Sequence, residues 1–245
     1  MRLEDKVAIV TGGGSGIGRA IALAYARAGA RVAIVDINIE MAESVKQAIV
    51  DMKRRAMAIR CDVSQKADVA QMVRKVVEEF GTVDILVNNA GITLRSRVID
   101  MPVEDWDRTM AINLRGPFLC AQAVLPYMMQ QRSGKIINIS SDSGKHGWAT
   151  GSAYCASKFG LLGLTEALSK EVAEEYGIRV NAICPGLVDT PMGRGAITAI
   201  GAEVDWSKVI QPEQIADIAV FLASDDSRAM FGASVDAFGL PSIFQ

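Results

Sequence analysis

The stretch Thr11-Gly12-Gly13-Gly14-Ser15-Gly16-Ile17-Gly18 follows the β-branched run Val7–Thr11 and precedes a helical pattern over residues 18–28. In a strand–turn–helix unit of this kind, the backbone can approach a pyrophosphate while the amides and dipole of the helix point at its charge. The turn therefore predicts a phosphate-binding site made by Gly12, Ser15, Gly16, Ile17 and Gly18.

The glycine spacing alone does not establish this site. It reads G-x-x-x-G-x-G from Gly12, which differs from the G-x-G-x-x-G of the commoner dinucleotide fingerprint, and no Walker lysine is present. Glycine also serves tight packing between a helix and a strand, so the surrounding sequence has to support a ligand site.

Strand and helix patterns alternate through the rest of the chain. Further β-branched runs cover residues 31–36, 56–61, 85–89, 135–140 and 179–184, and helical periodicity covers 41–53, 66–80, 103–113, 118–132 and 153–176. Most runs are apolar on both faces, as expected for strands of a sheet covered on both sides. The pattern predicts an α/β fold with a single doubly wound, Rossmann-type domain over residues 1–245 and a parallel sheet of about seven strands.

Three glycines are expected to end helices, Gly29, Gly81 and Gly177, because each stands just before a strand run. The stretch Pro191–Gln211 is rich in glycine and has weak periodicity. Because it is too long for an ordinary connection, we expect a substrate-binding loop at about residues 190–211.

The next strand run ends in Asp36, at the place where an acidic side chain would bind both hydroxyls of an adenosine ribose. The same carboxylate would repel a 2′-phosphate, and neither Ile37 nor Asn38 offers a positive charge. The sequence therefore favours NAD over NADP as cofactor. The alternative, an aspartate that only caps a helix, has less support beside the glycine turn.

Composition excludes several other classes of function. The 245 residues contain one histidine, His146, which excludes multi-histidine metal sites and leaves a Ser-His-Asp triad possible only around that residue. The four cysteines are far apart and form no CxxC pair. The net charge is −2 without a long basic run, which disfavours nucleic-acid binding. We expect neither a signal peptide nor a membrane span. The protein is therefore expected to be a cytoplasmic enzyme or binding protein.

Tyr154 and Lys158 lie in the long helical pattern, four residues apart, so they share one face of the helix. A phenol titrates near pH ~10, and a neighbouring ammonium group would bring its pKa toward neutrality. Taken alone, the pair would indicate only a solvated helix face.

Together, Thr11–Gly18, Asn88-Asn89-Ala90-Gly91, Ser141, Tyr154, Lys158 and Pro185-Gly186 resemble the short-chain dehydrogenase/reductase family, in its order and spacing, from about residue 4 to residue 236. The resemblance implies that Tyr154 is the catalytic acid or base and that Lys158 binds the nicotinamide ribose and lowers the pKa of the phenol. Ser141 would hydrogen-bond the substrate oxygen, with Ser140 and Ser143 as less well spaced rivals. Asn113 would hold a water that links the lysine to solvent.

The same resemblance implies further cofactor contacts. Asp62 and Val63 would meet the adenine ring, and the segment Asn89–Gly91 would pass under the adenosine ribose. The turn after the sixth strand run would contact the nicotinamide through Pro185, Gly186, Val188 and Thr190. Hydride would cross directly between cofactor and substrate, and no metal is implied.

The C-terminal tail departs from the family pattern. Where the family usually has Val-Asp-Gly-Gly, this chain has Val235-Asp236-Ala237-Phe238, followed by Gly239-Leu240-Pro241. A homotetramer built partly from the helices around Val103–Arg132 and Ala153–Tyr176 is expected, with the tail's effect on assembly open. For the substrate pocket we expect contributions from Thr93, Ser141, His146, Trp148, Met192 and Trp206, although a surface-loop role for His146 has more support.

These features predict an NAD-dependent oxidoreductase for a small secondary alcohol or ketone. One alternative is a 3-oxoacyl-[acyl-carrier-protein] reductase using NADPH, which the sequence Asn88–Thr93 also resembles. Two features disfavour this alternative. Asp36 disfavours NADPH, and the acidic stretch Glu174-Glu175 stands where such reductases present a basic residue to the acidic carrier protein. A non-catalytic dinucleotide-binding protein is a second alternative, which the intact Ser141, Tyr154 and Lys158 disfavour.

Overall fold

The computed structural model describes residues 1–239, so Leu240 and Pro241 of the atypical tail lie outside the described residues. A seven-stranded sheet forms the centre of the fold, with every neighbouring pair of strands parallel and the order β3-β2-β1-β4-β5-β6-β7. The strands are β1 (Val7–Thr11), β2 (Arg31–Asp36), β3 (Ala56–Arg60), β4 (Ile85–Asn88), β5 (Gly134–Ile139), β6 (Ile178–Pro185) and β7 (Ser234–Ala237). The predicted α/β class and parallel sheet are confirmed.

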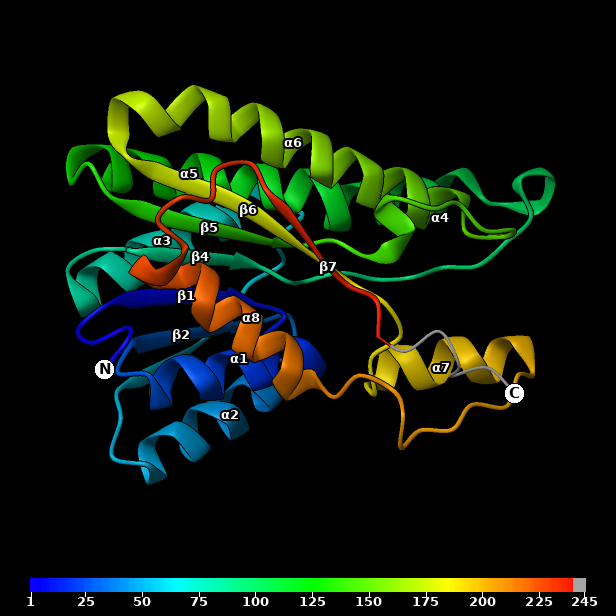
Figure 1. The fold of residues 1–245 in the computed structure, drawn as a ribbon, viewed down its shortest axis with the longest axis horizontal. Helices are drawn as coiled ribbons and strands as arrows, with labels where there is room; N and C mark the ends of the chain where they lie inside the picture. Colours follow the sequence, from blue (N-terminus) through cyan, green and yellow to red (C-terminus); the bar gives the residue numbers. More distant parts are fainter. Residues whose placement is uncertain (240–245) are drawn as a thin grey trace.

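Helices cover both faces of the sheet (Figure 1). They are α1 (Gly16–Arg27), α2 (Ile39–Asp51), α3 (Lys66–Phe80), α4 (Val103–Met110), α5 (Gly116–Gln130), α6 (Ser152–Tyr176), α7 (Pro191–Ile200) and α8 (Pro212–Ala223). Short 3-10 turns cover Val98–Asp100, Asp142–Gly144 and Asp225–Ser227, and a π-helical turn covers Ala111–Arg115.

Strand β1 shows why the runs are apolar on both faces. Its residues are all buried. Ala8 and Val10 pack into the hydrophobic cluster shared with α1, α2 and α8, whereas Val7 and Ile9 pack into the cluster shared with α3, α5 and α6. Because successive side chains of a strand point to opposite faces, a central strand covered on both sides has to be apolar throughout.

The predicted helix ends at Gly81 and Gly177 are confirmed. Both glycines adopt left-handed φ angles, of 89° and 66°, and both directly follow the last residue of a helix, α3 and α6. A residue with a Cβ atom would be strained in this conformation, which explains the choice of glycine.

Two predicted boundaries are wrong. The helix expected over residues 103–113 ends as an α-helix at Met110 and continues through the π-helical turn into α5, so no break separates the two expected helices. The stretch 191–211, expected as a loop, forms α7 over its first half. Thr190 caps α7 by accepting a hydrogen bond from the Gly193 amide at 3.0 Å, and Pro191 occupies the first turn.

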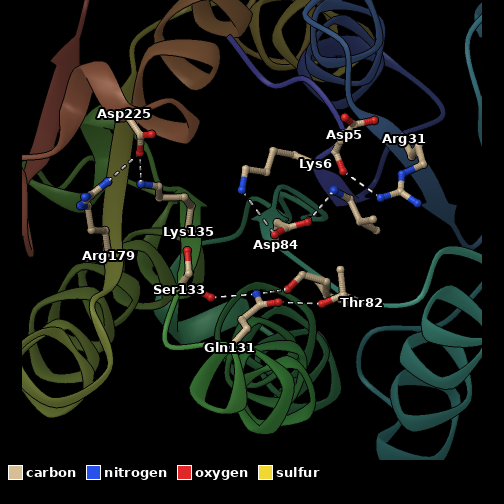
Figure 2. A network of polar contacts seen from close by, with 12 residues as sticks. Asp5, Lys6, Arg31, Thr82, Asp84, Gln131, Ser133, Lys135, Arg179 and Asp225 are labelled. Atoms are coloured by element: carbon tan, nitrogen blue, oxygen red, sulfur yellow. Dashed lines mark hydrogen bonds and ion pairs between the residues drawn. The ribbon is translucent and has the colours of Figure 1, made fainter. Parts of the chain in front are cut away.

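The amino ends of the strands are joined by a polar network (Figure 2). The Asp84 carboxylate accepts a hydrogen bond from the Val7 amide at 2.8 Å, at the start of β1. The Asp225 carboxylate lies 3.3 Å from the Lys135 ammonium and 3.6 Å from the Arg179 guanidinium, beside the first residues of β5 and β6. These contacts tie the strand starts together, which leaves the opposite edge of the sheet for a ligand site.

The strand order places this site. The chain moves outward from β1 through β2 to β3 and then returns to pair β4 with the other side of β1. Such a reversal opens a crevice at the carboxyl ends of the two strands, where ligands of open α/β sheets bind.

Candidate active site

A cavity of about 830 Å³ opens at the carboxyl ends of the strands, at the upper end of the size range of ligand pockets. Its wall includes nearly all of the predicted cofactor and catalytic residues: Gly12, Ser15, Gly16, Ile17, Asp36, Asp62, Val63, Asn89, Gly91, Ser141, Tyr154, Lys158, Pro185, Gly186, Val188 and Thr190. Of the predicted set, Gly18 and Asn113 lie outside this wall.

The glycine turn has the backbone shape of a phosphate cradle. Gly12 and Gly16 adopt left-handed φ angles of 61° and 50°. A Cβ atom on Gly16 would lie 3.1 Å from the Thr190 side chain, at the start of α7. Glycine therefore keeps the first turn of α1 close to α7 while leaving the backbone open to the cavity.

Gly18 serves packing instead of lining the cavity. A Cβ atom at this position would lie 2.1 Å from the Gly12 carbonyl oxygen and 2.5 Å from Asn89 Nδ2. The helix can approach the turn only because no side chain intervenes.

We expect Gly18→Ala to destabilise the protein by roughly 1–3 kcal/mol, the usual cost of overpacking, because the added methyl group meets backbone atoms that cannot rotate away. Chemical denaturation measures the loss, and Gly163→Ala on α6 is the matched control, because a Cβ there has no neighbour within 4 Å. Equal stability of the two variants would contradict the packing role.

Asp36 is held against the glycine turn. Its Oδ2 accepts a hydrogen bond from the Gly14 amide and its Oδ1 accepts one from the Asn38 amide, both at 3.0 Å. These contacts fix the carboxylate at the end of β2, on the wall of the cavity, so its charge is presented to whatever occupies that end.

Asn89 braces the turn from the neighbouring strand. Its Nδ2 donates hydrogen bonds to the carbonyl oxygens of Thr11 and Gly12, both at 3.0 Å. In return, the Thr11 hydroxyl accepts hydrogen bonds from the amides of Asn89 and Ala90, at 3.0 and 3.1 Å. Thr11 belongs to the motif recognised in the sequence, but this bracing role of its hydroxyl was not predicted.

Tyr154 and Lys158 meet one helical turn apart, as the spacing predicts. The Lys158 ammonium lies 5.6 Å from the centre of the Tyr154 ring and donates a hydrogen bond to the Ile139 carbonyl at 2.8 Å. Burial lowers the pKa of Lys158 to about 8, because a charged ammonium loses its hydration. Burial raises the pKa of Tyr154 to about 12, and the nearby Ser141 hydroxyl, which could donate to the phenolate, opposes this rise.

Ser141 follows β5, beside Tyr154. Its hydroxyl donates a hydrogen bond to Asp142 Oδ1 at 2.7 Å and accepts one from the Ser143 amide at 3.1 Å. The rival Ser140 donates its hydroxyl to the Lys158 carbonyl at 3.1 Å, and Ser143 donates to Asp142. Of the three serines, Ser141 is the one close enough to Tyr154 to lower the pKa of the phenol.

Asn113 is buried in the π-helical turn, behind the cavity wall. Its side chain accepts a hydrogen bond from the Ile92 amide and donates one to the Ile92 carbonyl, both at 2.9 Å. It also donates to the Ser157 hydroxyl at 3.1 Å. Asn113 thereby joins the segment after β4 to α6, one residue from Lys158.

The predicted substrate residues divide into two groups. Thr93, Trp148 and Met192 line the cavity, and the Trp148 ring lies 6.4 Å from the Tyr154 ring. His146 does not line it: this side chain is exposed, with its ring 6.0 Å from that of Phe238. Trp206 does not line it either, and instead packs against the Arg194 guanidinium at 4.5 Å.

Other wall residues were not anticipated from the sequence. They include Asp142 and Arg95, together with an apolar group formed by Ile92, Leu187, Ala196, Ile197 and Ile200. The Arg95 guanidinium lies 4.3 Å from the centre of the Trp148 ring. Asp142 could have been found in the sequence, because it is a charged residue directly after the predicted catalytic serine. Ala196, Ile197 and Ile200 could not, because they lie on α7, a helix that the sequence pattern did not indicate.

Two features are absent from residues 1–239. No described helix combines the length and apolarity that crossing a bilayer requires. Within the same range, no three His, Cys, Asp or Glu side chains are grouped as a metal site.

Comparison with known proteins gives one family. A family model described as short chain dehydrogenase matches residues 6–199. A 3-oxoacyl-[acyl-carrier-protein] reductase of Thermotoga maritima is 38% identical over 244 residues, covering 98% of both chains. A D-threitol dehydrogenase of Mycolicibacterium smegmatis is 41% identical over 239 residues, covering 96% of this chain and 92% of that one.

The solved structures agree with this result. The crystal structure of levodione reductase superposes with a TM-score of 0.91 at 34% identity, covering 96% of each chain. From the sheet order, the position of the cavity and these matches together, we conclude that the chain belongs to the short-chain dehydrogenase/reductase family.

Proposed function

We propose that the protein transfers hydride between NAD(H) and a small secondary alcohol or the matching ketone. The observation that carries this proposal is the meeting of Ser141, Tyr154 and Lys158 on the wall of one cavity that also contains Asp36. Family membership supports an oxidoreductase that acts on hydroxyl or keto groups. The cofactor preference and the substrate class are our inference.

The residues of the cavity fit a dinucleotide. The left-handed glycines of the turn leave room where a Cβ atom would intrude, and the helix start behind them supplies amides for a pyrophosphate. Asp36 would hold the adenosine ribose, Asp62 and Val63 would meet the adenine, and Pro185, Gly186, Val188 and Thr190 would face the nicotinamide. When bound, this cofactor supplies the hydride acceptor or donor.

Tyr154 and Lys158 would perform the proton transfer. Tyr154 gives a proton to a carbonyl oxygen in reduction and takes one from an alcohol in oxidation. The Lys158 ammonium stabilises the phenolate form of Tyr154 by its charge and is placed to bind a ribose hydroxyl. Ser141 would hold the reacting oxygen beside the phenol, and Asn113 would keep α6 and the segment after β4 in register.

The carrier-protein reductase remains the alternative, because one relative carries that name. The basic residue that could meet an acidic carrier is Arg132, whose guanidinium donates a hydrogen bond to the Glu175 carbonyl. The positive charge of Arg132 thus lies next to the acidic stretch Glu174-Glu175. Because these glutamates would repel an acidic carrier protein, this surface is a poor match for one. Asp36 also disfavours NADPH.

A substrate panel with both cofactors tests the proposal. Secondary alcohols and ketones should be turned over with NAD(H), as measured by NADH absorbance. Faster reduction of acetoacetyl thioesters with NADPH would favour the carrier-protein reductase. Binding of NADH without any turnover would favour a non-catalytic protein.

We expect Asp36→Ala to reduce the preference for NAD over NADP by about tenfold or more, because the charge that repels a 2′-phosphate is lost. The ratio of kcat/KM with the two cofactors measures the effect. Asp51→Asn, at the far end of α2, removes the same charge away from the cavity and should leave the ratio unaltered. An unaltered ratio in Asp36→Ala would contradict the ribose assignment.

We also propose a homotetramer and a cytoplasmic location. Phe118 on α5 and Phe159 on α6 are 45% and 47% exposed, and large apolar side chains on these helices are suited to a subunit interface. The four cysteines are free and buried, which agrees with a reducing compartment.

A further inference from the structure

Asp142, directly after Ser141, takes part in a chain of hydrogen bonds on the cavity wall. Its Oδ1 accepts hydrogen bonds from the hydroxyls of Ser141 and Ser143, at 2.7 and 3.1 Å. The Ser143 hydroxyl in turn accepts one from Trp148 Nε1 at 2.9 Å. These contacts hold the carboxylate beside the group that would meet the reacting oxygen of a substrate.

The second oxygen of this carboxylate is open. Among residues 1–239, no donor forms a hydrogen bond or ion pair with Asp142 Oδ2, although the residue is half-buried and lines the cavity. The nearby cations have other contacts. Lys145 pairs with Asp236, Lys158 donates to the Ile139 carbonyl, and Arg95 lies over the Trp148 ring.

A half-buried carboxylate is an acceptor that requires donors. An ionised carboxylate offers about four acceptor positions and no proton, and leaving such positions unfilled on desolvation is costly. A substrate that displaces water from this part of the cavity therefore binds well only if it supplies a donor to Asp142.

The Ser141 hydroxyl imposes a second condition. It carries one proton, and that proton is directed to Asp142 Oδ1. Ser141 cannot donate to the substrate oxygen at the same time. A substrate hydroxyl that donates to Asp142 partly satisfies its charge and weakens its hold on the Ser141 proton, which can then rotate toward the reacting oxygen.

We propose that Asp142 is a specificity-determining residue that binds a hydroxyl group on the carbon next to the reacting one. The site then selects vicinal diols, and in the reverse direction α-hydroxyketones, over simple alcohols and ketones. Ser141 and Asp142 are one hydrogen bond apart, which matches the short separation of neighbouring hydroxyls in a diol. This inference rests on the proposed alcohol or ketone activity and names its substrate class.

A neutral hydroxyl fits this position better than an ammonium group. Arg95 and Lys158 already bring positive charge to the cavity: both line it, Arg95 beside Trp148 and Lys158 beside Tyr154. A further positive charge on the substrate would be repelled by both, whereas a hydroxyl satisfies Asp142 without adding charge.

The test compares butane-2,3-diol with butan-2-ol, and acetoin with butan-2-one, because each pair differs by one hydroxyl group. A hydrogen bond to a charged group corresponds to roughly a 10–100-fold preference in kcat/KM for the hydroxylated substrate. Asp142→Ala should bring this ratio to about one, and it should raise kcat/KM for butan-2-ol because the Ser141 proton is freed. A purely structural role would lower both values together.

Two further variants sharpen the comparison. Asp142→Asn keeps the shape and one acceptor oxygen but loses the charge, so it should retain a preference about tenfold weaker than that of the wild type. Asp217→Asn removes an exposed charge on α8 outside the cavity and should leave the preference unaltered. Thermal unfolding and NADH binding verify that each variant folds.

A binding measurement separates this inference from the proposed function. The complex of the protein with NADH cannot oxidise an alcohol, so calorimetric titration with each of the two alcohols reports binding alone. A wild-type preference for butane-2,3-diol that Asp142→Ala removes supports the inference, even if the panel contradicts the proposed reaction. Equal affinity for the two alcohols in the wild type, an equal preference in Asp142→Ala, or stronger binding of the matching amino alcohol would overturn it.

Discussion

Tyr154→Phe is expected to abolish turnover while NADH still binds. The substitution removes one oxygen atom and leaves a ring of the same shape in the same place, so the cavity wall is retained. General acid–base catalysis contributes about 100- to 10,000-fold to a rate, and Tyr154 is the residue to which we assign the proton transfer. We expect kcat to fall by about 1,000-fold or more.

Steady-state rates with the best substrate of the panel measure this loss, and NADH titration measures the cofactor affinity. Tyr127→Phe on α5 provides the control, since Tyr127 is not part of the cavity wall and loses the same hydroxyl group. Turnover by Tyr154→Phe within tenfold of the wild type would show that another group transfers the proton.

Lys158→Met is expected to lower kcat/KM by about 100-fold or more. Methionine has a similar length, but it removes the charge that stabilises the phenolate and the donor that would reach a ribose hydroxyl. The wild-type rate of alcohol oxidation should rise with pH because the phenolate of Tyr154 is the base. In Lys158→Met this rise should move to higher pH, where the phenol ionises without help.

The same substitution should also alter the pH dependence of stability. The folded-state pKa of Lys158 is about 8, below its ordinary value of 10.5, because the buried ammonium is poorly solvated. Between these two values the unfolded chain binds more protons than the folded one, so the free energy of unfolding increases as pH rises through this window. Relative to Lys158→Met, the wild type should gain about 3 kcal/mol from pH 8 to pH 10.5.

Denaturation of the protein without nucleotide, at several pH values, measures this difference. Lys170→Met is the control, because Lys170 is exposed on the same helix and its change should leave the pH dependence parallel to that of the wild type. Parallel curves for the wild type and Lys158→Met would show that Lys158 is not buried as an ammonium.

The sequence predicts the strands well because their signal is local and unambiguous. A parallel strand covered on both faces has to be apolar at nearly every position, so β1, β2 and β6 read directly from their β-branched runs. Helix α7 was missed because Gly193 and Gly195 weaken both its helix propensity and its apolar pattern. Its cap, Thr190 followed by Pro191, was the signal available in the sequence.

The candidate site divides in a similar way. The pair Tyr154 and Lys158 is predictable because two residues four apart on one helix must share a face. Both His146 and Trp148 were expected at the substrate pocket, and of the two only Trp148 lines the cavity. The sequence could not separate them, because both follow a 3-10 turn whose path depends on packing. In the structure, Trp148 is held over the cavity by its hydrogen bond to Ser143, whereas His146 lies outside.

The sequence by itself determined most of the strands and the helices between them, the glycine-rich turn at Gly12–Gly18 and the Tyr154–Lys158 pair, because each depends on neighbours within a few residues. Only the tertiary structure decided that Asp36, Asp142 and Thr190 share one cavity. They come from segments far apart in the chain, and their meeting depends on the parallel register of the sheet and on the docking of α7. Long-range packing determines both the register and the docking, so neither can be predicted from a local pattern of residues.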